Sequence, residues 1–325
     1  MNILITGSSG QIGTNLALAL QARGTPPPRI LGIDKRQNSW TDQIPTLILD
    51  MTQPPTQQSL APALQFKPDI IVHLAAWAKV HQLVKEPDKA FENVAMTHWA
   101  LELARHAKDG GGVPIIFGSS REVYGDVRRH VTEESQADHV IAESPYSASK
   151  IAAEAFFSSY AKCYGLKTLI FRFSNVYGRY DNDLARMERV IPLFVQKISA
   201  GEPITVFGKD KMLDFTYIDD CVSGVIAGID ALSPGTAVPE LTLSSETINL
   251  AYGQGQTLYD LVTLIELATN KKAIATYLPS QTGEVTRYVA DITKARQLLG
   301  YNPQTPLTRG ILNYVQWCRQ TNFIP

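Results

Sequence analysis

One eight-residue segment of this chain carries side chains suited to acid–base chemistry. In ESPYSASK, Tyr146 and Lys150 stand four residues apart, after a potential N-cap serine, Ser144, and a first-turn proline, Pro145. On a helix, that spacing places the phenol and the ammonium on one face. A phenol has an ordinary pKa of about 10, and a nearby cation favours the phenolate. Tyr146 is therefore predicted to act as a general base near neutral pH.

A second polar segment, SSREVYG at residues 119–125, directly follows the apolar run Ile115–Phe117. Open α/β sheets bind their ligands at the carboxyl ends of such buried strands. Side chains two residues apart on a strand face the same side, so Glu122 is expected beside Ser120. Arg121 has two possible roles: it neutralises Glu122 from the solvent side, which we favour, or it forms an ion pair with a substrate carboxylate.

A glycine pattern near the N-terminus predicts a dinucleotide site. ILITGSSGQIG places Gly7, Gly10 and Gly13 after a first strand and at the start of a helix, with Gln11 and Ile12 at the helix amino terminus. Glycine permits the tight turn, the close approach of the backbone to a pyrophosphate and the close packing of the helix, and the helix terminus favours negative charge.

Asp34 supports this interpretation, because it ends a second apolar strand twenty-one residues after Gly13. A carboxylate at this position can accept both ribose hydroxyls and repel a 2′-phosphate. We therefore predict NAD rather than NADP, although Lys35 and Arg36 directly follow and weaken the distinction.

Two further strand ends complete the expected cofactor groove. Asp50 and Met51 follow a third strand, where the carboxylate either holds the adenine or simply caps a turn. The small residues Leu74, Ala75 and Ala76 follow a fourth strand, at a place where the middle of the cofactor must pass closely.

The elements that position these residues form a doubly wound α/β pattern, a Rossmann-like parallel sheet. Short apolar runs alternate with segments of helical period over residues 1–174, which calls for a sheet covered on both faces. Residues 175–325 are punctuated by Gly and Pro and suit a smaller mixed α/β substrate-binding lobe. Segments near 214–253 are expected to return to the larger domain.

Composition excludes several other classes of protein. The chain of 325 residues has a formal net charge of −1, so no basic surplus supports nucleic-acid binding. No apolar stretch approaches the length of a membrane span, and we expect a cytoplasmic protein. The three cysteines and six histidines show no metal-ligand spacing, so no metal site is expected.

Together, the glycines, Asp34, Ser120 and the Tyr146–Lys150 pair resemble the extended short-chain dehydrogenase/reductases, specifically the NAD-dependent nucleotide-sugar epimerases and dehydratases. The resemblance includes DITKARQLLGYNP at residues 291–303 and covers nearly the whole chain. It implies an NAD cofactor, a nucleotide-diphosphate sugar as substrate and no specific sugar.

The resemblance also implies roles for individual residues. Tyr146 takes the proton from the sugar C4 hydroxyl, Lys150 holds the ribose and tunes the tyrosine, and Ser120 hydrogen-bonds the reacting oxygen. Asn93 matches an asparagine near the cofactor, with a helix-surface amide as the alternative. The residues implied to contact the substrate are Asn175, Val190, Thr205, Val206 and Phe207.

Two departures from the family pattern concern the diphosphate. Relatives commonly carry arginine where this chain has Leu213 and Gln281. A diphosphate still needs cations, and the nearest candidates are Arg189, Lys211 and Arg287.

Three reactions share a 4-keto intermediate. We favour 4-epimerisation, because one tyrosine, one hydroxyl donor and a rotating ketone suffice for it. Glu122 also resembles a residue of sugar dehydratases and uronate decarboxylases, so dehydration and decarboxylation stay open. A protein that only senses NAD or a nucleotide sugar is a further alternative, which the Ser120, Tyr146 and Lys150 set argues against.

By family analogy, two long helices at 90–107 and 146–164 form a homodimer seam. Leu101, Phe156 and Phe157 are the candidate contacts, although these residues could equally belong to the core.

Overall fold

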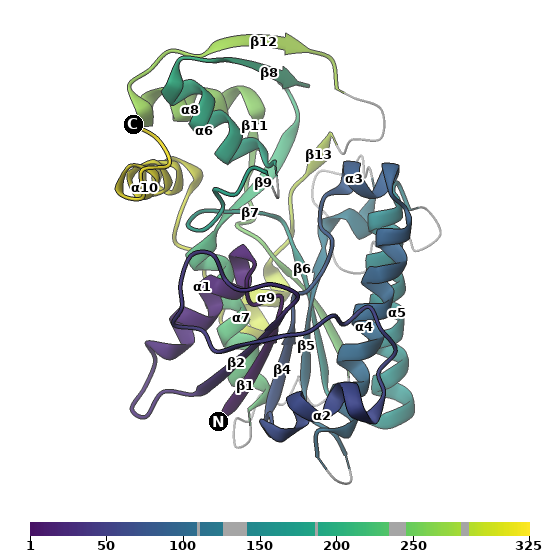
Figure 1. The fold of residues 1–325 in the computed structure, drawn as a ribbon. Coiled ribbons are helices and arrows are strands. Elements are labelled where there is room, and N and C mark those ends of the chain that lie inside the picture. The colour runs from purple at the N-terminus through teal and green to yellow at the C-terminus, as the bar shows by residue number, and fades with distance from the viewer. Residues whose placement is uncertain (109–110, 126–141, 186–187, 234–244, 281–285) are drawn as a thin grey trace.

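A seven-stranded, wholly parallel sheet forms the centre of the larger lobe in the computed structural model (Figure 1). The structure describes residues 1–108, 111–125, 142–185, 188–233, 245–280 and 286–325. The strand order is β10-β6-β5-β4-β1-β2-β3. The strands are β1 (Asn2–Thr6), β2 (Arg29–Asp34), β3 (Thr46–Ile48), β4 (Ile70–His73), β5 (Ile115–Ser120), β6 (Thr168–Phe173) and β10 (Ser245–Leu250).

Helices cover both faces of this sheet, so the predicted doubly wound α/β fold is confirmed (Figure 1). Side chains alternate across β1, where Ile3 and Ile5 join one core cluster and Leu4 joins the other. One face packs against α1 (Gln11–Gln21), α7 (Ile218–Leu232) and α9 (Thr293–Leu299). The other packs against α2 (Gln57–Gln65), α4 (Asp88–His106) and α5 (Pro145–Tyr164), with the short α3 (Val80–Lys85) nearby.

Helix α5 begins where the sequence predicts. The Ser144 hydroxyl accepts the N–H of Ser147 at 3.1 Å, and Ser147 returns a bond to Ser144, which satisfies two of the free donors at the helix start. Pro145 occupies the first turn, and Gly165 ends the helix with a φ of 69°. This local chemistry fixes where Tyr146 and Lys150 emerge.

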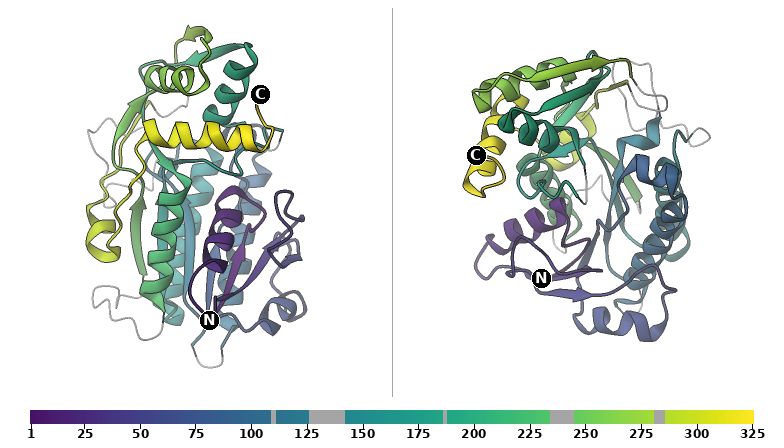
Figure 2. Two further views of the ribbon diagram at one scale, coloured as in Figure 1. Left: turned by 90° about the vertical axis from the view of Figure 1, so that its left-hand side faces the viewer. Right: turned by 45° about the horizontal axis from the view of Figure 1, so that its top comes forward.

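The second lobe lies beyond the carboxyl ends of the sheet strands (Figure 1; Figure 2 shows it from two further sides). It contains a four-stranded and a two-stranded sheet. Its elements are β7 (Asn175–Tyr177), α6 (Val190–Ala200), β8 (Pro203–Phe207), β9 (Met212–Tyr217), β11 (Gly255–Thr257), α8 (Leu258–Thr269), β12 (Ile274–Leu278), β13 (Arg287–Tyr288) and α10 (Leu307–Gln320).

The chain passes between the lobes several times. After β9 it returns through α7, which packs on α1, and through β10, which pairs with β6 at the sheet edge. The predicted domain boundary at residue 174 therefore stays a prediction, because elements on both sides of that residue belong to the larger lobe. Within the described residues, none of the helices combines the length and apolar character needed to cross a bilayer.

Asp214 holds the returning segments together. Its carboxylate is fully buried in β9 and accepts backbone N–H bonds from Tyr252 at 3.1 Å, Gly253 at 2.9 Å and Ala290 at 3.2 Å. Burial raises the pKa of this carboxyl to about 7. Both carboxylate oxygens have partners, so the β9 backbone is tied to two distant loops.

Candidate active site

The turn between β1 and α1 packs so closely on neighbouring backbone that it requires glycine. Gly7 has a φ of 71°, and a Cβ placed there would lie 2.7 Å from the backbone nitrogen of Ala75. A Cβ at Gly13 would lie 2.3 Å from the Gly7 carbonyl oxygen. Gly10 caps α1 without a side chain, and the first turn holds no acidic residue. The first N–H groups of the helix, including those of Gln11 and Ile12, are thus available to a pyrophosphate.

Asp34 ends β2 beside this turn. Its carboxylate is buried and accepts the N–H of Ser9 at 3.0 Å, and burial raises its pKa. The Arg36 guanidinium donates to the Ser9 carbonyl at 3.3 Å. The Lys35 ammonium lies 3.4 Å from the centre of the Trp77 ring. Lys35 and Arg36, the two cations that weakened the prediction of NAD over NADP, therefore both contact other residues of the protein.

The other predicted cofactor residues lie on the same edge of the sheet. The Asp50 carboxylate is exposed and accepts the N–H and hydroxyl of Thr52, as the turn alternative predicts, while Met51 is buried. The N–H groups of Leu74 and Ala75 donate to the Thr6 hydroxyl at 3.2 and 3.3 Å. Sequence reasoning missed Thr6, whose only signal is a polar residue at the end of an apolar strand.

Asn93 is a buried positioning residue, and the alternative of a helix-surface amide is wrong. Its side chain accepts the Trp77 N–H at 2.7 Å, and donates to the Trp77 carbonyl at 3.0 Å and to the Ser149 hydroxyl at 3.1 Å. Asn93 thereby joins the loop after β4, where Ala76 lies, to helix α5.

Ser120, Tyr146 and Lys150 come together at the carboxyl end of β5. The Ser120 hydroxyl lies close enough to the Tyr146 phenol to lower its pKa, against the effect of burial. The Lys150 ammonium donates to the Gly118 carbonyl at 2.8 Å and lies 5.8 Å from the centre of the Tyr146 ring. The structure thus assembles the predicted triad from one strand and one helix.

The protonation expected for the triad needs correction. Burial raises the pKa of Tyr146 to about 12, while the nearby Ser120 hydroxyl opposes this shift. Burial also lowers the pKa of Lys150 to about 8, against the charge of Glu154. The predicted lowering of the phenol pKa by the lysine is therefore wrong for the protein alone, because desolvation outweighs it.

A buried ion pair between Glu154 and Arg172 joins the helix that carries Tyr146 and Lys150 to the sheet, and sequence reasoning missed it. The Glu154 carboxylate, on α5, accepts two bonds from Arg172 of β6, at 2.6 and 3.0 Å, and one from Ser119 at 2.5 Å. Arg172 also lies 4.8 Å from the centre of the Tyr124 ring. The signal in the sequence was a single charged residue in the otherwise apolar and aromatic strand TLIFRF.

Glu122 does not lie on a strand. Strand β5 ends at Ser120, and residues Arg121–Tyr124 form a short 3₁₀ helix, η1, whose Glu122 N–H donates to the Ser120 hydroxyl at 3.2 Å. The predicted strand alternation is therefore wrong here. Arg121 pairs with Glu122 at 3.0 Å, with only 13% and 14% of the side chains exposed. The pairing predicted for Arg121 is present, but it is made from inside the protein rather than from the solvent side.

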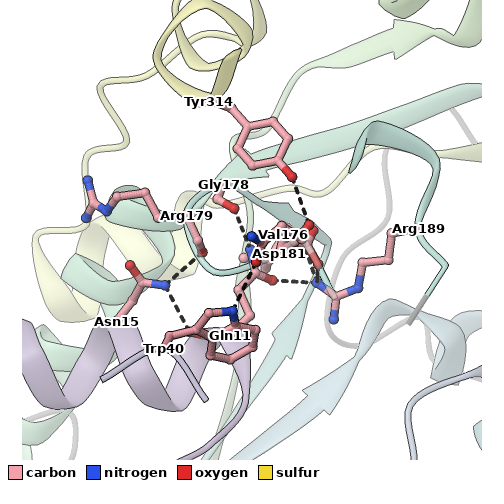
Figure 3. Close-up of polar contacts among 10 residues, drawn as sticks. Gln11, Asn15, Trp40, Val176, Gly178, Arg179, Asp181, Arg189 and Tyr314 are labelled. Atoms are coloured by element: carbon pink, nitrogen blue, oxygen red, sulfur yellow. Dashed lines mark hydrogen bonds and ion pairs between the residues drawn. The ribbon is translucent and has the colours of Figure 1, made fainter. Parts of the chain in front are cut away.

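Arg189 joins the substrate lobe to the cofactor turn (Figure 3). Its Nη1 donates to the Gln11 side-chain oxygen, to the Val176 carbonyl at 3.2 Å and to Asp181 at 3.3 Å. The Gln11 amide in turn donates to the Gly178 carbonyl at 3.4 Å. Arg189 precedes Val190, the first residue of α6, and one third of its side chain is exposed.

The remaining predicted substrate residues are spread over the second lobe. The Asn175 amide donates to the Asp214 carbonyl at 2.9 Å. On β8, Thr205 is exposed and Phe207 is half-buried. The Val206 side chain between them is fully buried in the core, and the predicted place of this segment along the nucleotide base stays a prediction.

An open hollow of ≈ 440 Å³ lies at the end of β8 and β12 and includes Lys211 in its lining. Arg287 lies on β13, paired in register with Met212. Leu213 is buried on β9, and Gln281 lies outside the described residues. Lys211 and Arg287 therefore lie in different parts of the second lobe.

Comparison with known proteins agrees with this geometry. Residues 3–239 match the model of the NAD dependent epimerase/dehydratase family. A probable UDP-glucuronate 4-epimerase of Rhizobium meliloti is 28% identical over 98% of this chain and 97% of its own length.

Two solved structures are also similar over nearly their whole length. The UDP-glucose 4-epimerase of Thermus thermophilus, in complex with NAD, has a TM-score of 0.84 and 26% identity, covering 98% of this chain and 99% of that one. The UDP-glucuronic acid 4-epimerase of Bacillus cereus, in complex with UDP-glucuronic acid and NAD, has a TM-score of 0.83 and 26% identity, covering 99% and 100%.

The buried ion pair makes a testable contribution to stability. Glu154→Ala leaves the Arg172 guanidinium buried without its carboxylate, which we expect to lower the free energy of unfolding by about 3–5 kcal/mol. Asp230→Ala removes the partner of Arg23 in a half-exposed pair and is expected to cost about 0–1 kcal/mol. Urea unfolding of both variants measures the difference, and equal costs would contradict this account of the pair.

Proposed function

The chain belongs to the NAD-dependent epimerase/dehydratase family, and we propose that it is a nucleotide-sugar 4-epimerase, an enzyme that inverts C4 of a sugar linked to a nucleoside diphosphate. The observation that carries the proposal is the placing of Ser120, Tyr146 and Lys150 together at the carboxyl end of β5, on the sheet edge that also carries the glycine turn after β1. A site that only sensed a ligand would not require this acid–base pair.

The cofactor is NAD, which when bound accepts a hydride from the sugar carbon and returns it. The N–H groups at the start of α1 would hold its pyrophosphate, and Asp34 its adenosine ribose. Gly7 and Gly13 leave the space that the backbone of the turn needs to approach it.

The residues of the chain supply the proton transfers. Tyr146 takes the proton of the C4 hydroxyl as that carbon is oxidised, and returns it when the alcohol re-forms. Ser120 hydrogen-bonds the same oxygen and fixes its place. Lys150 adds a cation close to the phenol, which favours the phenolate during the transfer. Inversion requires the 4-ketone to turn, so that its other face meets the hydride.

Glu122 supports epimerisation over dehydration or decarboxylation. Dehydration needs a further group that removes a proton at C5. Glu122 is instead half of a buried ion pair with Arg121, and an ionised, paired carboxylate is a poor proton carrier. Dehydration stays the second candidate, because Glu122 lies near enough to Tyr146 to raise the pKa of its phenol.

The proposal predicts a product of unchanged mass. We expect the purified chain to convert UDP-glucose or UDP-glucuronic acid to its C4 epimer, as seen by sugar-proton NMR together with mass spectrometry. Tyr146→Phe removes the proton acceptor and should slow the reaction by about 10²–10⁴-fold. Tyr160→Phe, on the same helix but bonded to Glu102, is the control and should keep its rate. A product lighter by one water would establish the dehydratase instead.

We also propose that Arg189 holds the diphosphate in place of the arginines that Leu213 and Gln281 replace. Its Nη1 is fixed by Gln11 and Asp181, and the rest of the guanidinium is partly exposed. Asn175, Thr205 and Phe207 are proposed to contact the sugar and the nucleotide base, with Lys211 and Arg287 as additional cations.

The diphosphate proposal is tested by binding. Arg189→Met should weaken the binding of UDP about tenfold or more, because a charge-assisted bond to phosphate is lost. The control is Arg179→Met, which breaks only a surface pair with Asp219. Titration calorimetry measures both, and unchanged affinity for UDP in Arg189→Met would refute the assignment.

A homodimer through α4 and α5 is the third part of the proposal. The two helices pack side by side (Figure 1), and they expose Phe91 and Phe156. Two of the predicted contacts are wrong, because Leu101 and Phe157 are fully buried in the core. The predicted cytoplasmic localisation is likewise a proposal, which cell fractionation tests.

The dimer predicts twice the chain mass of 35.8 kDa in light scattering after gel filtration. Phe156→Glu places a charge in the apolar seam and should give a monomer. Leu267→Glu changes an equally apolar, more exposed residue on α8 and should leave the dimer intact. A monomeric wild-type protein would rule out this part of the proposal.

A further inference from the structure

Arg121 lies near the catalytic phenol, with 13% of its side chain exposed. Its Nη2 pairs with Glu122 at 3.0 Å, and the guanidinium lies 5.6 Å from the centre of the Tyr288 ring. Burial raises the pKa of Tyr146 and of Asp214, and the charge of Arg121 opposes both shifts. Tyr288 belongs to β13, which pairs with β9, so the guanidinium also lies near this strand pair.

Two donors at this position have no partner within the described part of the chain. The Arg121 Nη1 is buried and makes no hydrogen bond, and neither does the buried hydroxyl of Tyr288. Glu122 engages only the Nη2 of Arg121, while both carboxylate oxygens of Asp214 are taken by backbone N–H groups.

Unpaired donors of this kind are rare in native proteins. A buried donor that loses water without gaining a partner destabilises the fold, and a charged donor does so most. Two such donors on side chains in contact, next to the reacting phenol, indicate an acceptor that a ligand brings.

We propose that Arg121 and Tyr288 form the subsite for a carboxylate on C5 of the sugar, so that the preferred substrate is a nucleotide-linked hexuronic acid. This inference rests on the proposed function, which places the C4 oxygen at Tyr146. The C5 substituent is the neighbour of C4 on the ring, so the proposal has it reach from Tyr146 to Arg121.

The chemistry of the two donors selects the acid over a neutral hexose. A carboxylate offers two acceptor oxygens and a negative charge, which match a guanidinium and a phenol hydroxyl. A hydroxymethyl group offers one oxygen that also needs an acceptor, and would leave one donor unpaired. Lysine could not replace Arg121, since its ammonium lacks the planar fork that holds Glu122 and a second acid together.

The test compares UDP-glucuronic acid with UDP-glucose as substrates of the full chain. The measured quantity is the ratio of kcat/KM for the acid to kcat/KM for the hexose. We expect the wild type to favour the acid, and Arg121→Met to reduce the ratio by about tenfold or more.

Tyr288→Phe is the second variant and avoids the risk of misfolding. The hydroxyl that it removes has no hydrogen bond in the free protein, so stability should be kept while the ratio falls severalfold. Arg121→Met/Glu122→Gln removes the pair without leaving a lone buried charge. Equal losses for both sugars in all three variants would show that the pair acts only on structure.

The outcomes separate the two proposals. A wild type that epimerises UDP-glucose as well as, or better than, UDP-glucuronic acid would overturn the carboxylate subsite and leave the epimerase intact. A wild type that converts neither sugar would overturn the epimerase and, with it, this inference.

Discussion

The buried carboxylate of Glu154 is the contact on which the geometry of the site depends. It stands on the same helix as Tyr146 and Lys150 and binds Ser119 of β5 and Arg172 of β6. Helix α5, which carries Tyr146 and Lys150, is thus fixed to strands β5 and β6 by charge-assisted bonds in a medium of low dielectric. Such bonds are directional, whereas apolar packing alone would allow the helix to slide along the sheet. The phenol is therefore held close to Ser120.

The second lobe depends on the cofactor turn in a comparable way. Gln11 at the start of α1 accepts a bond from Arg189 and donates one to Gly178, and Asn15 one turn later donates to the Arg179 carbonyl at 3.1 Å (Figure 3). Tyr314 of α10 holds the Asp181 carbonyl at 2.8 Å on the far side. The lobe proposed to bind the sugar is consequently joined to the turn proposed to receive the dinucleotide. Displacement of that turn would move both proposed sites at once.

Local rules were sufficient for much of the fold and part of the site. The glycines, the Ser144 cap and the apolar strands each express a short-range preference, and each occurs where the sequence predicts. The missed contacts join residues far apart in the chain: Glu154 is 18 residues from Arg172, and Arg189, predicted only as a cation for the diphosphate, is 178 residues from Gln11. A periodic hydrophobic pattern indicates which residues are buried, but it does not indicate which buried charged residues form ion pairs with one another. Glu122 shows a different limit of prediction from sequence. Its orientation was predicted from the alternation of side chains along a strand, but the 3₁₀ helix that begins directly after Ser120 ends that alternation.

The electrostatics around Tyr146 explain why the phenol is protonated before ligands arrive. Desolvation raises its pKa most, and Glu122 adds to this, while Arg189 and Arg121 oppose it. The two guanidinium groups also have carboxylate partners, Asp181 and Glu122, so their charges are largely compensated. A substrate that binds its anionic groups to either arginine removes part of that compensation and changes the balance at the phenol. Lys150, which donates a hydrogen bond to the neutral Gly118 carbonyl, adds a further cation 5.8 Å from the centre of the phenol ring. The same groups that recognise the substrate therefore also set the proton affinity of the base, so binding and catalysis are not separable by residue in this site.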